Sequence, residues 1–240
     1  MKRILLLILL VFGIGNAFGQ VNIATDGLNN STTLFSFSGA GAYYNGNSAS
    51  GDRPATTAFA SEGTHSRGVT NGSAVMTSNN INTAAYSSVE MSVRLASFSI
   101  GSTTNGADGS DEVKIEVSPN GGTNWYSTLT VSGNANAFWS FTSGTGIATT
   151  PYDGNATAVD FSPAAGGART TDGYSTLIIT GLPSSASLKI RITLLNNAAS
   201  ERWVVDDFVV KGVVSSPTTT VSATTLSNFT YVVGNGPSAF

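Results

Sequence analysis

The chain contains no cysteine and a single histidine, His65. Without cysteine there are no disulfide bonds, thiolate zinc sites or cysteine nucleophiles. One histidine is a poor basis for a transition-metal site, and no Gly-x-Ser-x-Gly motif accompanies it, as a serine hydrolase would require. His65 lies in the polar stretch 63–67, and we expect a solvated loop residue there. The remaining chemistry depends on oxygen ligands and aromatic rings.

Charge is also sparse, because charged residues make up 10% of the 240 residues. The formal net charge is −3. It becomes −5 if the basic residues Lys2 and Arg3 are removed with an N-terminal signal peptide. The other basic residues are scattered along the chain. Proteins that bind phosphate backbones concentrate Lys and Arg on one face, so no nucleic-acid partner is expected.

Long apolar runs are absent apart from residues 4–14 near the N-terminus. That run follows Lys2 and Arg3 and precedes Ala17-Phe18-Gly19. Ala17 and Gly19 are small residues at the two positions that a signal peptidase recognises. We therefore expect residues 1–19 to be a signal peptide cleaved before Gln20. The run is too short for a membrane helix, which needs about 20 apolar residues. The mature chain is expected to be exported, without a membrane span, to the outer cell surface or the medium.

Short runs of alternating β-branched and polar residues, separated by Gly and Asn, make up most of the chain. This pattern is typical of β-strands with one buried face, and no window after the leader shows helical periodicity. We expect an all-β protein, an antiparallel β-sandwich of the jelly-roll kind. The pattern aromatic-x-x-Asp-Asp-hydrophobic at 203–208 also resembles the last strand of galactose-binding-like and concanavalin-like sandwiches. The clearest strands lie at 89–95, 113–117, 125–131, 188–194 and 201–212. The segment Pro119–Thr123 predicts a hairpin, because its Asn-Gly pair suits positive φ angles.

An ordered set of segments carries a family resemblance. It resembles one jelly-roll-like module of secreted and surface multidomain proteins of the Bacteroidetes, which are cargo of type IX secretion. The resemblance covers nearly all of residues 20–212 and implies a module that sits beside enzymatic or adhesive domains. The segments are Asn45–Pro54, Val89–Ser99, Asn105–Trp125, Thr130–Phe141, Arg169–Pro183 and Glu201–Val210.

The C-terminal residues 213–240 differ in composition and pattern from the rest of the chain. Residues 213–220 are rich in Ser, Pro and Thr, as linkers are, and residues 221–240 are similar to the opening strands of an immunoglobulin-like repeat. We therefore expect a sandwich domain at 20–212, a linker at 213–220 and the truncated start of a second domain at 221–240. A native C-terminal tail is the alternative.

Glycoside hydrolysis needs two carboxyl groups about 5 to 10 Å apart. Glu112 and Glu116 lie about 13 Å apart along one strand. A pairing of Glu90 with Glu112 or Glu116 across strands is an alternative, but salt bridges with Arg94 and Lys114 account for the same residues. We therefore expect no enzymatic activity.

Calcium is the better prediction for the acidic residues. Asp108 and Asp111 stand in an oxygen-rich stretch before a strand, and Ca²⁺ prefers carboxylate and carbonyl oxygens. Asp206 shares a predicted strand face with Val204 and Phe208, so we expect it to be buried and neutralised by a cation, an arginine or N–H donors. The predicted metal ligands are Asp108, Asp111 and Asp206; purely hydrogen-bonded roles are the alternative, with Arg191 or Arg202 as partners of Asp206.

Aromatic rings are the candidates for sugar binding, because an exposed ring can stack on a pyranose. Alternation places Trp139 and Trp203 in the core, which leaves Tyr43, Tyr44, Tyr126 and Tyr152 as predicted ligand-binding residues. The sequence thus predicts a non-catalytic module for binding, adhesion or spacing in a larger surface protein. The alternatives are a carbohydrate-binding module attached to a hydrolase, with a polysaccharide or cell-surface glycan as partner, and a glycosidase-type sandwich enzyme.

Overall fold

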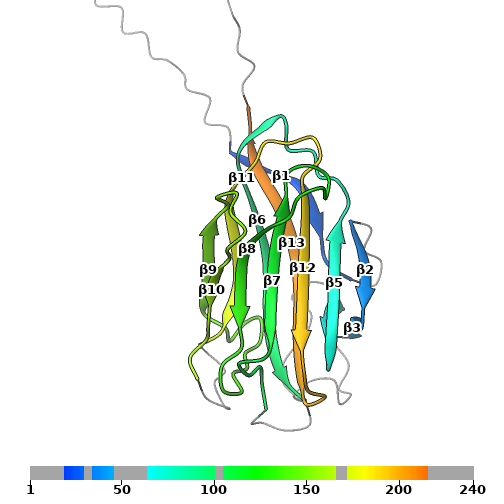
Figure 1. Ribbon diagram of the computed structural model, residues 1–240, viewed down its shortest axis with the longest axis vertical. Helices are drawn as coiled ribbons and strands as arrows, with labels where there is room; N and C mark the ends of the chain where they lie inside the picture. The colour runs from blue at the N-terminus through cyan, green and yellow to red at the C-terminus, as the bar shows by residue number, and fades with distance from the viewer. Residues whose placement is uncertain (1–18, 30–33, 46–63, 101–104, 166–171, 216–240) are drawn as a thin grey trace, which may run out of the picture.

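The computed structural model describes residues 19–29, 34–45, 64–100, 105–165 and 172–215. All the regular elements in these ranges are β-strands, and they form two sheets stacked face to face (Figure 1). The predicted all-β sandwich is therefore confirmed. Within the same ranges, no helix is long and apolar enough to cross a membrane.

The first sheet, called the long sheet here, contains two strands of 14 residues, β6 and β13. Its strand order is β3-β4-β13-β6-β11-β9, and β1 also pairs with β13. All its neighbouring strands are antiparallel except β9 and β11, which are parallel. The strands are β1 (Gln20–Asp26), β3 (Ala42–Asn45), β4 (His65–Val69), β6 (Tyr86–Ser99), β9 (Gly146–Pro151), β11 (Tyr174–Leu182) and β13 (Glu201–Val214).

The second sheet, called the short sheet, has the strand order β10-β8-β7-β12-β5-β2. Its pairs are antiparallel except β8 with β10, so each sheet of the sandwich contains one parallel pair at an edge. The strands are β2 (Phe35–Gly39), β5 (Gly72–Ser78), β7 (Glu112–Ser118), β8 (Tyr126–Ser132), β10 (Val159–Phe161) and β12 (Lys189–Asn196).

The core lies between the sheets, and the alternation seen in the sequence fills it. Eleven apolar residues of the predicted strands are each at most 1% exposed. Because strand side chains point alternately to opposite faces, this period places every second residue of β6, β7 and β12 inside. These core residues are Val89, Met91, Val93, Leu95, Val113, Ile115, Val117, Leu188, Ile190, Ile192 and Leu194.

The predicted hairpin joins β7 to β8, as expected, but its turn differs in detail. The positive φ angles fall on Gly121 (71°) and Gly122 (97°), not on Asn120. Asn120 instead uses its side chain, since its Oδ1 accepts hydrogen bonds from the Ser118 hydroxyl and the Asn124 backbone N–H. The loop is therefore held by side chains rather than by a two-residue turn.

The last strand, β13, contains a bulge at its centre. Asp206 lies opposite Arg94, whereas Val209 lies opposite Ser92, so two residues of β13 oppose one residue of β6. Asp207 occupies the bulge with a φ of 48°. A bulge shifts the alternation by one residue, which changes the strand's inward face halfway along its length.

This shift corrects one prediction. Trp203 and Val205 belong to the main core before the bulge, and Phe208 belongs to the same core after it. Val204 instead joins a separate cluster with Ala96, Phe98 and Phe141. Phe208 was predicted to share a face with Val204 and Asp206, which is wrong because the prediction assumed unbroken alternation.

The strands of the two sheets span residues 20–214. β1 begins at Gln20, and β13 continues to Val214, two residues into the predicted linker. The predictions of a leader at 1–19 and of a second domain at 221–240 fall almost wholly outside the described residues, and so does the rest of the linker beyond Ser215.

Candidate functional site

Three carboxylates meet at the end of the sandwich where β7 and β13 begin and β12 ends, at the bottom of Figure 1. They belong to Asp108, Asp111 and Glu201, and one oxygen from each lies within 4.8 Å of the others. The structure thus brings together two of the three predicted metal ligands, Asp108 and Asp111. It adds Glu201, which the sequence analysis did not consider as a ligand.

Backbone N–H groups fix the two aspartates. Asp111 accepts hydrogen bonds from the N–H groups of Asp108 (2.8 Å) and Asn197 (2.9 Å), one at each carboxylate oxygen. Asp108 accepts one from the N–H of Ser110 at 2.8 Å. Short polar side chains that bond nearby N–H groups are typical of such turns, so the loop conformation itself orients these carboxylates.

Glu201 is held differently, by burial at the first position of β13. It is 4% exposed, and its Oε2 atom has no hydrogen-bond partner among the described residues. Burial raises the pKa of Glu201 to about 8, and a hydrogen bond to Asp111 and the negative charges of Asp111 and Asp108 act in the same direction. Burial also raises the pKa of Asp111, against the opposing effect of its two N–H donors.

Gly133, which follows β8, allows the acidic loop to pack closely. Its N–H donates to the Asp111 carbonyl at 2.8 Å. A Cβ at this position would lie 2.0 Å from the Asp108 carbonyl oxygen, far inside van der Waals contact. Glycine therefore lets two backbones approach in a way that any side chain prevents.

Asp206, the third predicted metal ligand, does not join this cluster. It lies five residues farther along β13 than Glu201, which corresponds to roughly 16 Å. It is fully buried, as predicted. The Ser66 hydroxyl donates to its Oδ2 (2.8 Å) and the Asp207 N–H to its Oδ1 (2.9 Å). Asp206 therefore fits the hydrogen-bonded alternative better than the calcium prediction.

The two arginines proposed as partners of Asp206 have other contacts. Arg191 forms a salt bridge with Glu116 at 2.6 Å on the short sheet and stacks over Trp125, with 4.2 Å to the ring centroid. Arg202 donates from Nε to the Thr70 hydroxyl at 2.8 Å.

The alternative of a cross-strand pair between Glu90 and Glu112 or Glu116 is contradicted by the sheet topology. Glu90 lies on β6 of the long sheet, whereas the other two lie on β7 of the short sheet. Glu90 forms a salt bridge with Lys211 at 3.0 Å. Ion pairs do account for Glu90 and Glu116, but through Lys211 and Arg191 rather than through Arg94 and Lys114. Arg94 donates instead to the Phe141 carbonyl.

His65 opens strand β4 rather than lying in a loop, so that prediction is also wrong. The ring is half-buried, and its Nδ1 lies 2.8 Å from the Thr64 hydroxyl. Its backbone N–H donates to the Asn29 side chain at 3.3 Å.

The predicted ligand-binding tyrosines Tyr43 and Tyr44 are half-buried and contact different groups. The Arg67 guanidinium lies over the Tyr43 ring (4.9 Å to its centroid) and also over the Phe37 ring (4.4 Å). Tyr44 packs on the second hydrophobic cluster, with the Arg202 guanidinium 3.7 Å from its centroid. Neighbouring strand residues point to opposite faces, so these two rings do not form one platform.

Tyr126 and Tyr152, the other predicted pair, contact each other. Their centroids are 6.0 Å apart, with an interplanar angle of 83°, an edge-to-face arrangement. Both rings are half-buried. Coplanar rings suit stacking on a sugar better than perpendicular ones do. Trp139 and Trp203 are in the core, as predicted, at 1% and 0% exposure.

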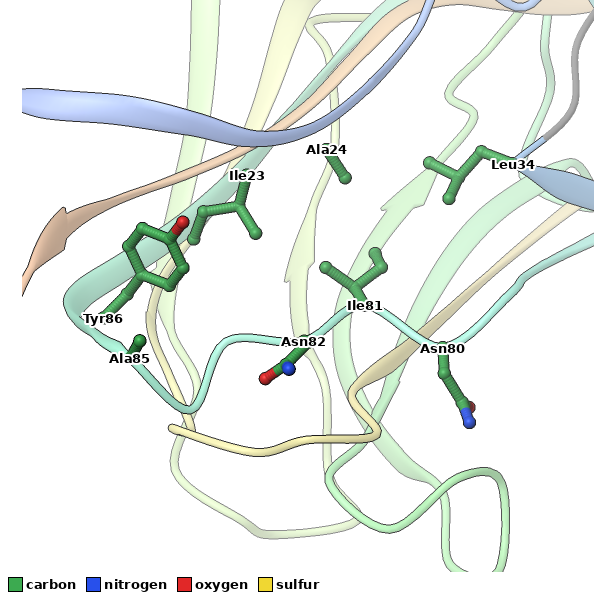
Figure 2. Close-up of a pocket in the computed structure, with 8 residues that line it drawn as sticks. All are labelled: Ile23, Ala24, Leu34, Asn80, Ile81, Asn82, Ala85 and Tyr86. Atoms are coloured by element: carbon green, nitrogen blue, oxygen red, sulfur yellow. The ribbon is translucent and has the colours of Figure 1, made fainter.

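A groove that the sequence analysis missed lies at the opposite end of the sandwich, between β1 and the segment joining β5 to β6. It has a volume of about 520 Å³. Figure 2 shows Ile81 pointing toward β1, while the side chains of Asn80 and Asn82 point away from β1. The full lining is Ile23, Ala24, Leu34, Asn80, Ile81, Asn82, Ala85 and Tyr86.

The groove combines apolar walls with neutral polar groups. Tyr86 is half-buried and forms one end of the groove next to Ile23 (Figure 2). The side chain of Asn80 is exposed and has no hydrogen bond with the described residues, whereas Asn82 accepts one from the Ala84 N–H at 3.1 Å. The described lining residues include no Asp, Glu, Lys, Arg or His. No sequence motif marks this groove, because its walls come from segments about 60 residues apart.

No family model matches the chain, and no curated protein matches it. The solved structures that are similar to this chain, all at low identity, include the following three. The K3 cleaved adhesin domain of Lys-gingipain from Porphyromonas gingivalis has 9% identity and a TM-score of 0.41, with 80% of this chain and 99% of that chain covered. The C-terminal family 22 carbohydrate-binding module of a Clostridium thermocellum protein has 12% identity and a TM-score of 0.39, covering 82% and 96%. A xylan-binding domain from Paenibacillus barcinonensis has 11% identity and a TM-score of 0.39, covering 84% and 99%.

Proposed function

We propose that this chain is a non-catalytic binding or adhesion module of a larger exported protein, and that it takes its ligand in the groove beside Tyr86. The observation that carries the proposal is the groove itself: about 520 Å³ in volume, with apolar walls and no acidic, basic or histidine side chain among its described lining residues. Pockets of this size are typical of small-ligand sites.

The chemistry of the lining favours a neutral carbohydrate. A sugar ring presents an apolar face and a rim of hydroxyl groups, so it suits an aromatic ring beside amide groups. Tyr86 provides the ring, and Asn80 provides an amide that forms no hydrogen bond with the described residues. A polysaccharide or cell-surface glycan is therefore the partner class that the groove fits best.

The positions of the carboxylates support a non-catalytic role. A glycosidase needs two carboxyl groups on either side of a bound sugar. Asp111 and Glu201 are buried, at 1% and 4% exposure, at the end of the sandwich away from the groove. Glu90 and Glu116 are engaged in salt bridges. A spacer role is the alternative, and it predicts that the groove binds nothing.

Export and attachment to further domains are part of the proposal. They rest on the signal-peptide pattern of residues 1–19 and on the Ser/Pro/Thr-rich segment 213–220 of the sequence. Adhesion through such a module places the groove on the outer cell surface or in the medium.

The test is calorimetric titration of the full chain with soluble neutral glycans (xylan, mannan and β-glucan oligosaccharides) and with polygalacturonate as the charged comparison. We expect saturable binding of a neutral glycan. Tyr86→Ala should weaken it at least about tenfold, because truncating an aromatic residue at the centre of a binding site costs about 2 kcal/mol or more.

Tyr126→Ala is the matched control, since it removes an equally half-buried tyrosine outside the groove. Binding that Tyr126→Ala abolishes and Tyr86→Ala leaves intact would move the site to the ring pair Tyr126 and Tyr152. No binding to any glycan would favour the spacer role. Release of reducing ends from the glycans would contradict the non-catalytic proposal.

A further inference from the structure

The acidic end of the sandwich has the donor set of a hard-cation site. The ligand oxygens of Asp108, Asp111 and Glu201 lie within 4.8 Å of one another. Two oxygens bound to one Ca²⁺ at about 2.4 Å each lie at most about 4.8 Å apart. The three carboxylates are thus already close enough to share one ion.

A second observation points to a missing partner. Glu201 is 96% buried, yet its Oε2 atom has no hydrogen-bond partner among the described residues. A buried carboxylate oxygen without a partner is costly, because it loses its hydration without compensation. An ion held between Glu201 and the two aspartates supplies that compensation.

The charges around the cluster all have the same sign. The charged groups that act on Glu201 are the carboxylates of Asp111 and Asp108. No basic side chain in the described ranges forms a salt bridge with any of the three. Like charges at this separation repel strongly in a buried setting, so either a cation or a shared proton must neutralise them.

The donor types select the cation. All three ligands are carboxylates, and the chain has no cysteine and one histidine, which lies on β4. Transition metals favour nitrogen and sulfur donors, whereas Ca²⁺ takes six to eight oxygens in flexible geometry. Mg²⁺ demands stricter octahedral geometry and retains its water, so it suits a cluster of buried carboxylates less well.

We propose that Asp108, Asp111 and Glu201 form a Ca²⁺ site that ties the 105–111 loop to the first residue of β13. The loop and the strand start are about 90 residues apart in sequence, so the ion cross-links distant parts of the chain. The site lies at the other end of the sandwich from the groove, so this inference does not rest on the proposed function. The alternative to the ion is a proton shared between Glu201 and Asp111.

The test is thermal unfolding and calorimetric titration of the full chain after EDTA treatment and dialysis, at pH 7.5, with CaCl₂ and with MgCl₂. We expect saturable Ca²⁺ binding with a rise in midpoint, because a ligand of the native state stabilises it by mass action. Glu201→Gln should abolish binding. It is nearly isosteric, and its amide can still donate to Asp111, so the metal-free variant should fold. Asp108→Asn should weaken Ca²⁺ binding at least about tenfold through the lost charge.

Glu90→Gln is the matched control, since it removes a glutamate that forms a salt bridge on the long sheet. It should leave the Ca²⁺ response unchanged. Absence of any Ca²⁺ heat or midpoint shift in the unsubstituted chain would overturn the proposal in favour of the shared proton. A Ca²⁺ response that persists in Glu201→Gln and Asp108→Asn would also overturn it, by placing the ion elsewhere.

Discussion

At one end of strand β6, Ser99 pairs with Glu201, which is one of the three clustered carboxylates. At the other end, Tyr86 lines a groove whose described residues are all neutral. The two ends are roughly 43 Å apart along this one strand. One scaffold therefore carries two different kinds of chemistry. Substitutions this far apart should act independently, so each end can be tested without disturbing the other.

The largest expected effect is a loss of stability at the acidic end, the end of the sandwich that holds Asp108, Asp111 and Glu201. Gly133→Ala places a Cβ 2.0 Å from the Asp108 carbonyl oxygen, and the overpacking should lower the free energy of unfolding by about 3 kcal/mol. Urea unfolding measures it. Gly109→Ala in the same loop is the control, because its Cβ would meet nothing within 4 Å. Equal effects of both substitutions would show that close packing against Gly133 does not shape this end.

Asp206→Asn tests whether the buried carboxylate at the bulge of β13 acts independently of the acidic end. Asp206 accepts hydrogen bonds from Ser66 and Asp207 while fully buried, so its loss should cost about 1 to 3 kcal/mol. The Ca²⁺ response of the variant should equal that of the unsubstituted chain. Loss of Ca²⁺ binding, measured by titration, would return Asp206 to the metal ligands predicted from sequence.

The pH dependence of stability sharpens the contrast, since the acidic end contains a carboxyl group with a strongly raised pKa. The pKa of Glu201 is about 8 in the fold, against an ordinary value of 4.5. Between these values the unfolded chain binds fewer protons at this site, so metal-free stability should fall as pH rises from about 4.5 to 8. The slope is at most about 1.4 kcal/mol per pH unit. Unfolding in EDTA at several pH values measures it.

Glu201→Gln should reduce this slope, because glutamine does not titrate. A slope unchanged by the substitution would assign the pH dependence to other carboxylates. Added Ca²⁺ should oppose the loss of stability at pH 8, since the ion favours the ionised form.

The smallest effect concerns the groove. Asn80→Ala removes an exposed amide that bonds no described residue, so stability should change by less than about 0.5 kcal/mol. Affinity for a neutral glycan should fall several-fold as one hydrogen bond is lost. Calorimetric titration and urea unfolding measure the two quantities. A large stability loss with unchanged affinity would make Asn80 a structural residue of the loop.

Much of the fold follows from local pattern. Alternation along β6, β7 and β12 predicted which side chains enter the core, because burial of one strand face demands that period. The pattern failed at Phe208, where the bulge at Asp207 reverses the faces of β13. It also failed to separate Glu90 from Glu112, because alternation does not tell which strands share a sheet.

The sequence by itself determined the all-β class, the core faces of the main strands and the proximity of Asp108 to Asp111, because each depends on residues close together in the chain. Only the tertiary structure decided that Glu201 joins these aspartates, that Asp206 does not, and that Ile81 and Tyr86 face β1 across a groove. Strand pairing brings residues about 60 to 90 positions apart into contact. The register and the bulge that set those contacts arise from packing the two sheets together, which no local spacing encodes.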